Sequence, residues 1–278
     1  MNILGVNLSN NASICIMKDG VVDFYLEAER INRKKYSNSI KCLLPYIDCD
    51  IDVIAVSHCY WDNSTEQLLS VMDLRKVTNM FPNAKVYDYR DRHHMTHAAC
   101  AWYRSGFDDA VAIVVDANGS KTGERWVSEK IEIESMYDLP SWNVIHKRYF
   151  DDHDVGIGKE FEQCCIRHGW HHMDAGKVMG KASYGQSKVT SAPDGRADSH
   201  SMYKVNDCHR VQKKWERRAL QLANLTDKDL VLVGGCFLNC TVNYMLKKKL
   251  GRKIYAEPIS TDGGTSIGAA YLAKAEHT

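Results

Sequence analysis

The chain has 278 residues, which is enough for one large domain or for two lobes. With 44% hydrophobic and 26% charged residues it has the composition of an ordinary globular protein, and its net charge of +1 gives no general reason to bind nucleic acid or a membrane surface. No stretch approaches the roughly 20 consecutive apolar residues of a membrane-spanning helix.

The first part of the chain predicts three strands in succession, followed by strands that alternate with helices. Turn residues such as Gly20 separate the first strands, as in a small antiparallel meander. The expected strands cover 2–9, 12–20, 21–30, 51–58 and 84–89, and the expected helices cover 64–77 and the residues from about 92 onward.

The same order of elements returns in the second part of the chain. The expected strands there cover 109–119, 123–137 (as one strand or two), 142–150, 229–235 and 253–258, and the expected helices cover 156–169, 209–223, 238–249 and 263–277, with a polar, insertion-like stretch over 185–208. A repeated βββαβαβα order predicts an α/β fold of two duplicated lobes, 1–107 and 108–278, that face each other across a cleft. Two unrelated α/β domains are the alternative.

Three turns are suited to a nucleotide in that cleft. In both halves the turn after the first strand is small and polar, "NLSNNAS" (7–13) and "DANGSKTG" (116–123), and such turns present backbone N–H groups to phosphate. In "VLVGGCFLN" (231–239), a strand runs into Gly234–Gly235, where a flat ligand or a phosphate can approach the backbone closely. A tight strand-to-helix turn without a ligand is the other interpretation of this last piece.

The segment "RHHMTHAAC" (92–100) indicates a metal site. His93 and His97 are four residues apart, so on a helix their imidazoles project from one face. Asp116 ends the first strand of the second half and Asp262 precedes the last helix, so both carboxylates are placed to reach the cleft. Such a mixed set suits iron, zinc or manganese more than calcium or magnesium. Asp116 would otherwise hold a metal-bound water or the substrate.

Five motifs in a fixed order give the chain a family resemblance. They are "HHMTHA" (93–98), "DANG" (116–119), "GKVMGKASYG" (176–185), "GGCFLNCTVN" (234–243) and "DGGTSIGAA" (262–270). Together they resemble the N-terminal domain of the O-carbamoyltransferases of the nodulation (NodU) and tobramycin or cephamycin type, over nearly the whole chain. The closest relatives of that family make threonylcarbamoyl-adenosine in tRNA.

The resemblance implies a fold, a cofactor set and a reaction. The fold is the one shared by actin, sugar kinases and the Hsp70 ATPase domain. The resemblance implies a metal, usually Fe²⁺, held by His93, His97 and Asp262, to which we add Asp116. It also implies carbamoyl-adenylate, made from carbamoyl phosphate and ATP, whose carbamoyl group passes to a hydroxyl of a small molecule.

Further residues are expected to serve the nucleotide and the proton transfer. The expected nucleotide contacts are Asn11, Asn118, Gly119, Lys177, Gly234, Gly235, Asn239 and Gly263. Lys177 would pair with phosphate or would simply form a salt bridge. A base must accept the hydroxyl proton, and Asp174 and His172 are candidates because they adjoin the "AGKVMG" motif; an exposed turn is the alternative.

The chain departs from the family pattern at three places. Asn10–Asn11 stands where members usually have His-Asp; Asn10 keeps the catalytic position, but an amide cannot act as a base at neutral pH. Lys181 stands where an apolar residue is common. The chain ends eight residues after "IGAA", whereas typical members continue into a YrdC-like activating domain, so we expect a separate YrdC-like activating protein as a partner.

Two other functions remain open at this point. The basic clusters "KKWERR" (213–218) and Lys247–Lys249 would serve carbamoylation of a nucleic acid, either tRNA or a modified DNA base, although a solvated helix face is the favoured explanation for each. A non-catalytic subunit that binds nucleotide and metal is the other. The N-terminal residues are too polar for a signal peptide, and the ten cysteines contain no CxxC pair. These observations predict a cytoplasmic protein whose thiols are reduced.

Overall fold

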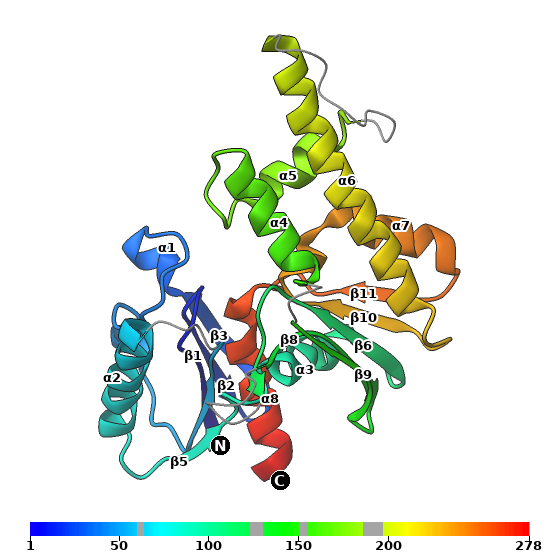
Figure 1. Ribbon diagram of the computed structural model, residues 1–278. Helices are drawn as coiled ribbons and strands as arrows, with labels where there is room; N and C mark the ends of the chain where they lie inside the picture. The colour runs from blue at the N-terminus through cyan, green and yellow to red at the C-terminus, as the bar shows by residue number, and fades with distance from the viewer. Residues whose placement is uncertain (60–63, 123–129, 151–154, 186–196, 278) are drawn as a thin grey trace.

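Two mixed β-sheets, built from successive parts of the chain, form the frame of the protein (Figure 1). The computed structural model describes residues 1–59, 64–122, 130–150, 155–185 and 197–277. The first part of the strand segment expected over 123–137 and residues 186–196 of the insertion expected over 185–208 lie outside these ranges, so those expectations are only partly covered.

The first sheet has the order β3-β2-β1-β4-β5. Its strands are β1 (Asn2–Asn7), β2 (Ser13–Lys18), β3 (Val21–Glu27), β4 (Val53–Ser57) and β5 (Lys85–Asp88). The central strands β1 and β4 are parallel and read as nearly unbroken apolar runs, because helices cover both faces of the sheet. The helical segments of this half are α1 (Ala28–Asn32), η1 (Leu44–Tyr46), α2 (Ser64–Met80) and α3 (His93–Ser105).

The second sheet repeats the same plan. Its strands are β6 (Ala110–Val115), β7 (Lys121–Thr122), β8 (Lys130–Leu139), β9 (Asn143–Tyr149), β10 (Leu230–Val233) and β11 (Ile254–Ala256). When β6, β8, β9, β10 and β11 are numbered one to five, both sheets have the spatial order 3-2-1-4-5, with antiparallel pairs on one side of the first strand and parallel pairs on the other. The predicted duplicated α/β fold is confirmed.

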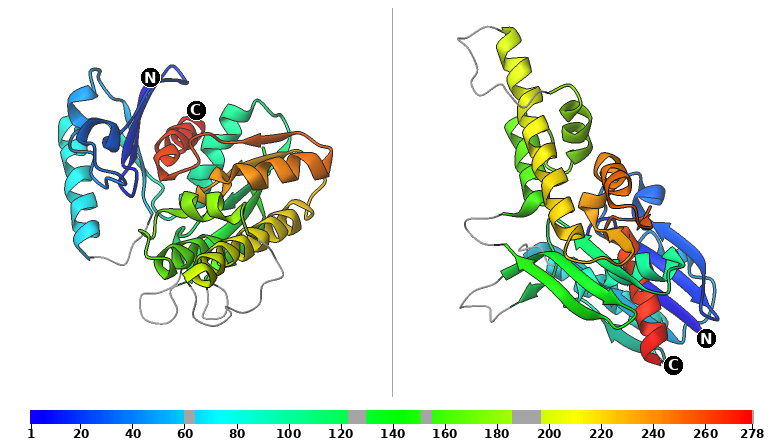
Figure 2. Two further views of the ribbon diagram at one scale, coloured as in Figure 1. Left: turned by 90° about the horizontal axis from the view of Figure 1, so that it is seen from above. Right: turned by 90° about the vertical axis from the view of Figure 1, so that its right-hand side faces the viewer.

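The second half carries more of the described helical segments, including the longest, α6. They are α4 (Gly156–Arg167), α5 (Ala175–Ala182), α6 (Ala197–Ala223), η2 (Gly235–Leu238), α7 (Cys240–Leu250), η3 (Asp262–Gly264) and α8 (Thr265–His277). Figures 1 and 2 show α4, α5 and the long α6 rising together from one end of the second sheet. Within the described ranges, no helix has the length and apolar character needed to cross a membrane.

The helices α3 and α8 are exchanged between the two halves. Helix α8, from the end of the chain, packs on β1, β2 and β4 of the first sheet, whereas α3 packs on β6, β8 and β10 of the second. The two helices also pack directly on each other, and Gly268 permits this because a Cβ there would lie 1.7 Å from the Thr96 carbonyl oxygen. A division of the chain at residue 107 therefore assigns α3 and α8 each to the half whose sheet it does not cover.

The structure corrects several expected element boundaries. Helix α6 begins at Ala197 rather than near 209, because most of the residues from 197 to 207 are polar and resemble a loop in the sequence. The strand expected over 21–30 ends at Glu27, where α1 begins. The expected helix 238–249 is divided at Asn239, whose side chain caps α7 by accepting from Val242 N at 3.2 Å. Helix α5 was not expected.

We predict that Gly268→Ala destabilises the protein by several kcal/mol, because the new methyl group overlaps the backbone of α3 at a buried crossing. Gly180→Ala is the matched control: it also lies in a helix, a Cβ added there would have no other atom within 4 Å, and the higher helix propensity of alanine should stabilise the protein by up to about 1 kcal/mol. Urea unfolding measures both. Equal unfolding midpoints for wild type and Gly268→Ala would contradict the close crossing.

A buried carboxylate fastens α6 to the second sheet. Glu134 of β8 is 1% exposed and accepts hydrogen bonds from Arg218 Nε at 3.0 Å and from Arg148 of β9. Burial alone would raise the pKa of Glu134, but His146, Arg148 and Arg218 together hold it well below its usual range. Because the folded-state pKa is depressed, this contribution to stability is complete above the unfolded pKa of about 4.3 and is lost as the pH falls below it.

Glu134→Gln should therefore lower the free energy of unfolding at pH 7 by about 1–3 kcal/mol and flatten its dependence on pH between about 3 and 5. The exposed pair of Lys18 and Asp23 provides the control, since Asp23→Asn should change stability by less than about 0.5 kcal/mol. Denaturation series at several pH values test both variants, and an unchanged acid slope for Glu134→Gln would disprove the assignment.

Candidate functional site

Four side chains from distant parts of the sequence converge where the two halves meet. His93 and His97 lie in the first two turns of α3, Asp116 follows β6, and Asp262 lies in η3 just before α8. One nitrogen or oxygen atom of each lies within 4.8 Å of those of the others. These are the four residues that the sequence predicted as a metal site, and the structure brings all of them together.

The ligand atoms form a tight, nearly regular arrangement. His97 Nε2 lies 3.3 Å from Asp116 Oδ2 and 3.6 Å from Asp262 Oδ1. His93 Nε2 lies 3.8 Å and 3.5 Å from the same two oxygens, and 3.2 Å from His97 Nε2. Ligands about 2.1 Å from a tetrahedrally coordinated ion are about 3.4 Å apart. The donor atoms therefore fit an ion of that kind without large movement.

Second interactions orient the two carboxylates. Asp116 Oδ1 accepts from the backbone N of Ala117 at 2.7 Å, which leaves Oδ2 facing the histidines. Asp262 Oδ2 accepts from Ser9 Oγ at 3.3 Å, which leaves Oδ1 facing them. Ser9, which sequence reasoning missed, thus links the turn after β1 to the cluster, as outer partners of metal ligands do.

The electrostatics of the cluster favour a cation. Both imidazoles are fully buried, which by itself lowers the pKa of a histidine, but Asp262 and Asp116 outweigh this effect. They raise the pKa of His93 to about 10, and they also raise the pKa of His97 above its usual value. Burial would raise the pKa of both carboxyl groups, yet the histidines hold both below their usual range. The ionised carboxylates create a negative site that protons or a metal ion can occupy.

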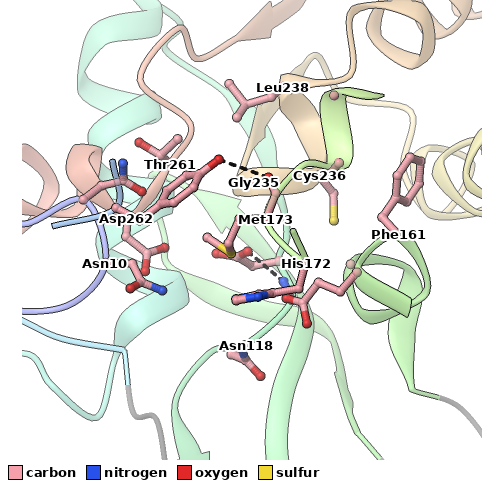
Figure 3. A pocket seen from close by; sticks show the side chains of 18 of the residues that line it. Asn10, Asn118, Phe161, His172, Met173, Gly235, Cys236, Leu238, Thr261 and Asp262 are labelled. Carbon is pink, nitrogen blue, oxygen red and sulfur yellow. Dashed lines mark hydrogen bonds between the residues drawn. The ribbon is translucent and has the colours of Figure 1, made fainter. Parts of the chain in front are cut away.

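A cavity of about 360 Å³ adjoins the cluster, with walls from both halves of the chain (Figure 3). The predicted site residues in its wall are Asn10, Asn11, Asp116, Asn118, His172, Gly235, Asn239 and Asp262. Figure 3 shows Asp262 and Asn10 on the side opposite Phe161, with His172 and Met173 between them. The volume suits a small organic ligand.

Much of the cavity wall was not predicted from the sequence. The residues that were missed include Tyr36, Cys59, Phe161, Glu162, Met173, Met179, Leu238 and Thr261. Tyr36 OH donates to the Met173 carbonyl oxygen at 3.1 Å and so joins the first half to the segment between α4 and α5. Gly158 could have indicated from the sequence that this part of α4 packs closely on another segment. A Cβ there would lie 2.6 Å from Ala117 Cα, so α4 closely approaches the "DANG" turn.

Three glycines expected to contact a nucleotide serve close packing beside the cavity instead of lining it. A Cβ on Gly119 would lie 2.7 Å from His94 Nε2, and one on Gly263 would lie 2.7 Å from Tyr25 OH. Gly234 has a φ of +95°, a conformation that favours glycine, and its Cα lies against the backbone of Val115. Because these three glycines have no side chains, the turns around the cluster can pack closely against their neighbours.

Asp174 and Lys177 pair with each other outside the cavity wall. Lys177 Nζ donates to Asp174 Oδ2 at 2.6 Å, and the lysine side chain is 57% exposed. This hydrogen bond lowers the pKa of Asp174, which makes it a weaker base. Of the two base candidates, only His172 lines the cavity. The lysine near the "DANG" turn is Lys159. When the side-chain amide of Asn118 is turned so that its oxygen faces this lysine, the oxygen accepts a hydrogen bond from Lys159 Nζ at 3.2 Å.

Comparisons with known proteins agree on the fold and include a distant relative by sequence. The chain is 24% identical to the nodulation protein NolNO of Sinorhizobium fredii over 330 residues of alignment, which cover 95% of this chain and 46% of that protein. The chain thus spans about half the length of this curated relative. No family model matches.

Solved structures with low sequence identity share the fold over the whole chain. The activator of 2-hydroxyisocaproyl-CoA dehydratase from Clostridium difficile, solved with bound ADPNP, has a TM-score of 0.56 and 12% identity, covering 99% of this chain and 95% of its own. The ROK hexokinase from Thermus thermophilus has a TM-score of 0.54 and 11% identity, with full coverage of both chains. These likenesses establish the actin- and sugar-kinase-like fold.

We predict that the protein binds one Mn²⁺ in the His93–His97–Asp116–Asp262 cluster, and that His97→Ala or Asp262→Asn weakens this binding more than about 100-fold, because losing even an outer partner of a ligand costs about 10–100-fold. Mn²⁺ prefers oxygen and nitrogen ligands, so electron paramagnetic resonance titration reports this cluster. His277→Ala, at an exposed site near the C-terminus, should bind as the wild type does. If Asp262→Asn binds Mn²⁺ as tightly as the wild type, the ion is not bound at this cluster.

Proposed function

We propose that this chain transfers a carbamoyl group from carbamoyl-adenylate to a hydroxyl of a small molecule. The observation that carries the proposal is the convergence of His93, His97, Asp116 and Asp262 beside a cavity that both halves line. The ordered motifs around these residues resemble those of O-carbamoyltransferases. The distant likeness to a nodulation protein over 95% of the chain supports the same family.

The cavity is suited to an adenylate. Phe161, Leu238 and Met179 give it apolar surface for a flat base, while Asn118 and Gly235 lie at the ends of β6 and β10, where backbone groups are free to approach phosphate. The dehydratase activator of the same fold was solved with bound ADPNP. These features support nucleotide binding between the lobes.

The metal cluster lies at the wall of the cavity, so its chemistry would act on the reacting end of the adenylate. A divalent transition metal, Fe²⁺ by family resemblance, would polarise the carbamoyl carbonyl or neutralise the leaving phosphate, an effect worth several kcal/mol. His93 and His97 would hold it from α3, and Asp116 and Asp262 would hold it from the cavity side. Ser9 would keep the Asp262 carboxylate turned toward it.

The acceptor hydroxyl must lose a proton as the new C–O bond forms. Asn10 lines the cavity and can orient the acceptor by hydrogen bonding, but its amide cannot take a proton. Asp174 is paired with Lys177 away from the cavity wall. We therefore assign the general base to His172, whose ring lies in the wall. The adenylate would come from carbamoyl phosphate and ATP on a separate YrdC-like activating protein.

The experiment combines the chain with a YrdC-like activating domain, carbamoyl phosphate, ATP, Fe²⁺ and a panel of hydroxylated acceptors, including nucleosides, tRNA and DNA. Mass spectrometry should detect one acceptor that gains a single carbamoyl group. Omission of either protein, or His97→Ala, should abolish the gain. A carbamoylated product found only on tRNA or DNA would show that the acceptor is a nucleic acid and not a small molecule. Binding of the adenylate without any transfer would favour a non-catalytic subunit.

His172→Asn should lower kcat about 10²–10³-fold while leaving Mn²⁺ affinity unchanged, because it removes a proton acceptor and no ligand. His171→Asn, next to it but outside the cavity wall, is the matched control and should retain most activity. If both variants retain full turnover, another group accepts the proton.

A further inference from the structure

A second cluster of metal-ligand side chains lies in the part of the molecule formed by α4 and α6. Cys164 and His168 are four residues apart at the end of α4, and Cys208 faces them from α6. Their ligand atoms lie within 4.8 Å of one another, and all three residues are buried. The described part of the chain contains only two groups of this kind. This one shares no residue with the other, the cleft cluster of His93, His97, Asp116 and Asp262.

We propose that Cys164, His168 and Cys208 bind one Zn²⁺ ion. The two Sγ atoms are 3.9 Å apart, and two thiolates at about 2.3 Å from a tetrahedral zinc ion are about 3.8 Å apart. The three side chains therefore need little movement to close on an ion, and water would complete the coordination. Binding replaces two thiol protons, which are released to solvent, with no change in oxidation state.

The surroundings of the cluster supply what a ligating histidine needs. Asp207 Oδ2 lies 3.0 Å from His168 Nε2 and accepts from Cys164 Sγ at 3.6 Å. With Nδ1 of His168 as the ligating atom, the contact to Nε2 would be the carboxylate–histidine contact that orients imidazole ligands at zinc sites. Asp207 is itself held by Arg167 Nε at 3.1 Å and by Arg210 at 2.5 Å, so its place is fixed. We assign Asp207 the role of positioning His168.

The charges around the cluster act in both directions: the contact with Cys208, burial and Asp207 raise the pKa of Cys164, whereas the pKa of Cys208 is lowered. Two thiolates cancel the charge of a divalent ion, while Arg167 and Arg210 compensate Asp207. Lys181 of α5 adds a further positive charge that acts on Cys208.

The neighbouring residue Cys165 shows the contrast. It is as buried as Cys164 and belongs to the same apolar core, yet it is outside the group of ligand atoms. It therefore provides a matched control for the effect of losing a buried thiol.

The site has a structural consequence for the cavity. Helix α4 carries Phe161 and Glu162 into the cavity wall, one turn before Cys164. An ion shared by α4 and α6 would fix that wall to the long helix. The site is thus expected to support the shape of the cavity from outside it.

The test is a Co²⁺ titration of the full chain, kept reduced with a phosphine. Thiolate-to-cobalt charge transfer gives a near-ultraviolet band, which the cleft cluster cannot give, because its four ligands are nitrogen and oxygen atoms. We expect the wild type and His97→Ala to show the band, and Zn²⁺ to abolish it by displacing Co²⁺. Cys208→Ser should lose the band, whereas Cys165→Ser should retain it.

Several results would overturn the proposal. They are the absence of the band in reduced, folded wild type, its loss in His97→Ala, and its persistence in Cys208→Ser. Circular dichroism establishes that each variant is folded, and the wild-type titration decides the question even if Cys208→Ser does not fold. The proposal does not depend on the carbamoyl-transfer function, since the readout requires no activity.

Discussion

The close crossing of α3 and α8 is the contact on which the rest of the structure depends. Because Gly268 has no side chain, the two helices approach until the Thr96 carbonyl meets its Cα, and each helix then packs on the sheet of the other half. Their first turns consequently lie next to each other. His93 begins one of these helices and Asp262 lies in the turn that leads into the other, so the crossing brings the two histidines of α3 next to Asp262.

The cluster also illustrates how burial and charge oppose each other in this protein. Desolvation by itself would drive protons off His93 and onto Asp116, but mutual attraction reverses both tendencies. The same balance recurs at Glu134, which is buried among cationic side chains, and at Asp207, which two arginines hold. In each case a carboxylate inside the second half fastens elements that are far apart in sequence.

Local patterns in the sequence were sufficient for the repeated order of strands and for the four cluster residues. The spacing of His93 and His97 is a property of one helical turn, and Asp116 follows from the end of a strand. The cavity wall could not be predicted in this way, because Phe161 and Tyr36 meet there only through tertiary packing. Glycines were the ambiguous signal: Gly119 and Gly263 resemble phosphate-contacting residues, yet each makes room for a neighbouring side chain. Lys177 was ambiguous in the same way and proved to pair with Asp174.

The exchange of α3 and α8 gives the cluster an unusual mechanical position. His93, His97 and Asp116 move with the second sheet, whereas Asp262 leads into the helix that rests on the first. An ion held by all four would therefore join an element of each half of the molecule. Its affinity and the arrangement of the two halves are then thermodynamically linked, so that whatever spreads the two halves loosens the ion, and the ion in turn resists their spreading to the same extent.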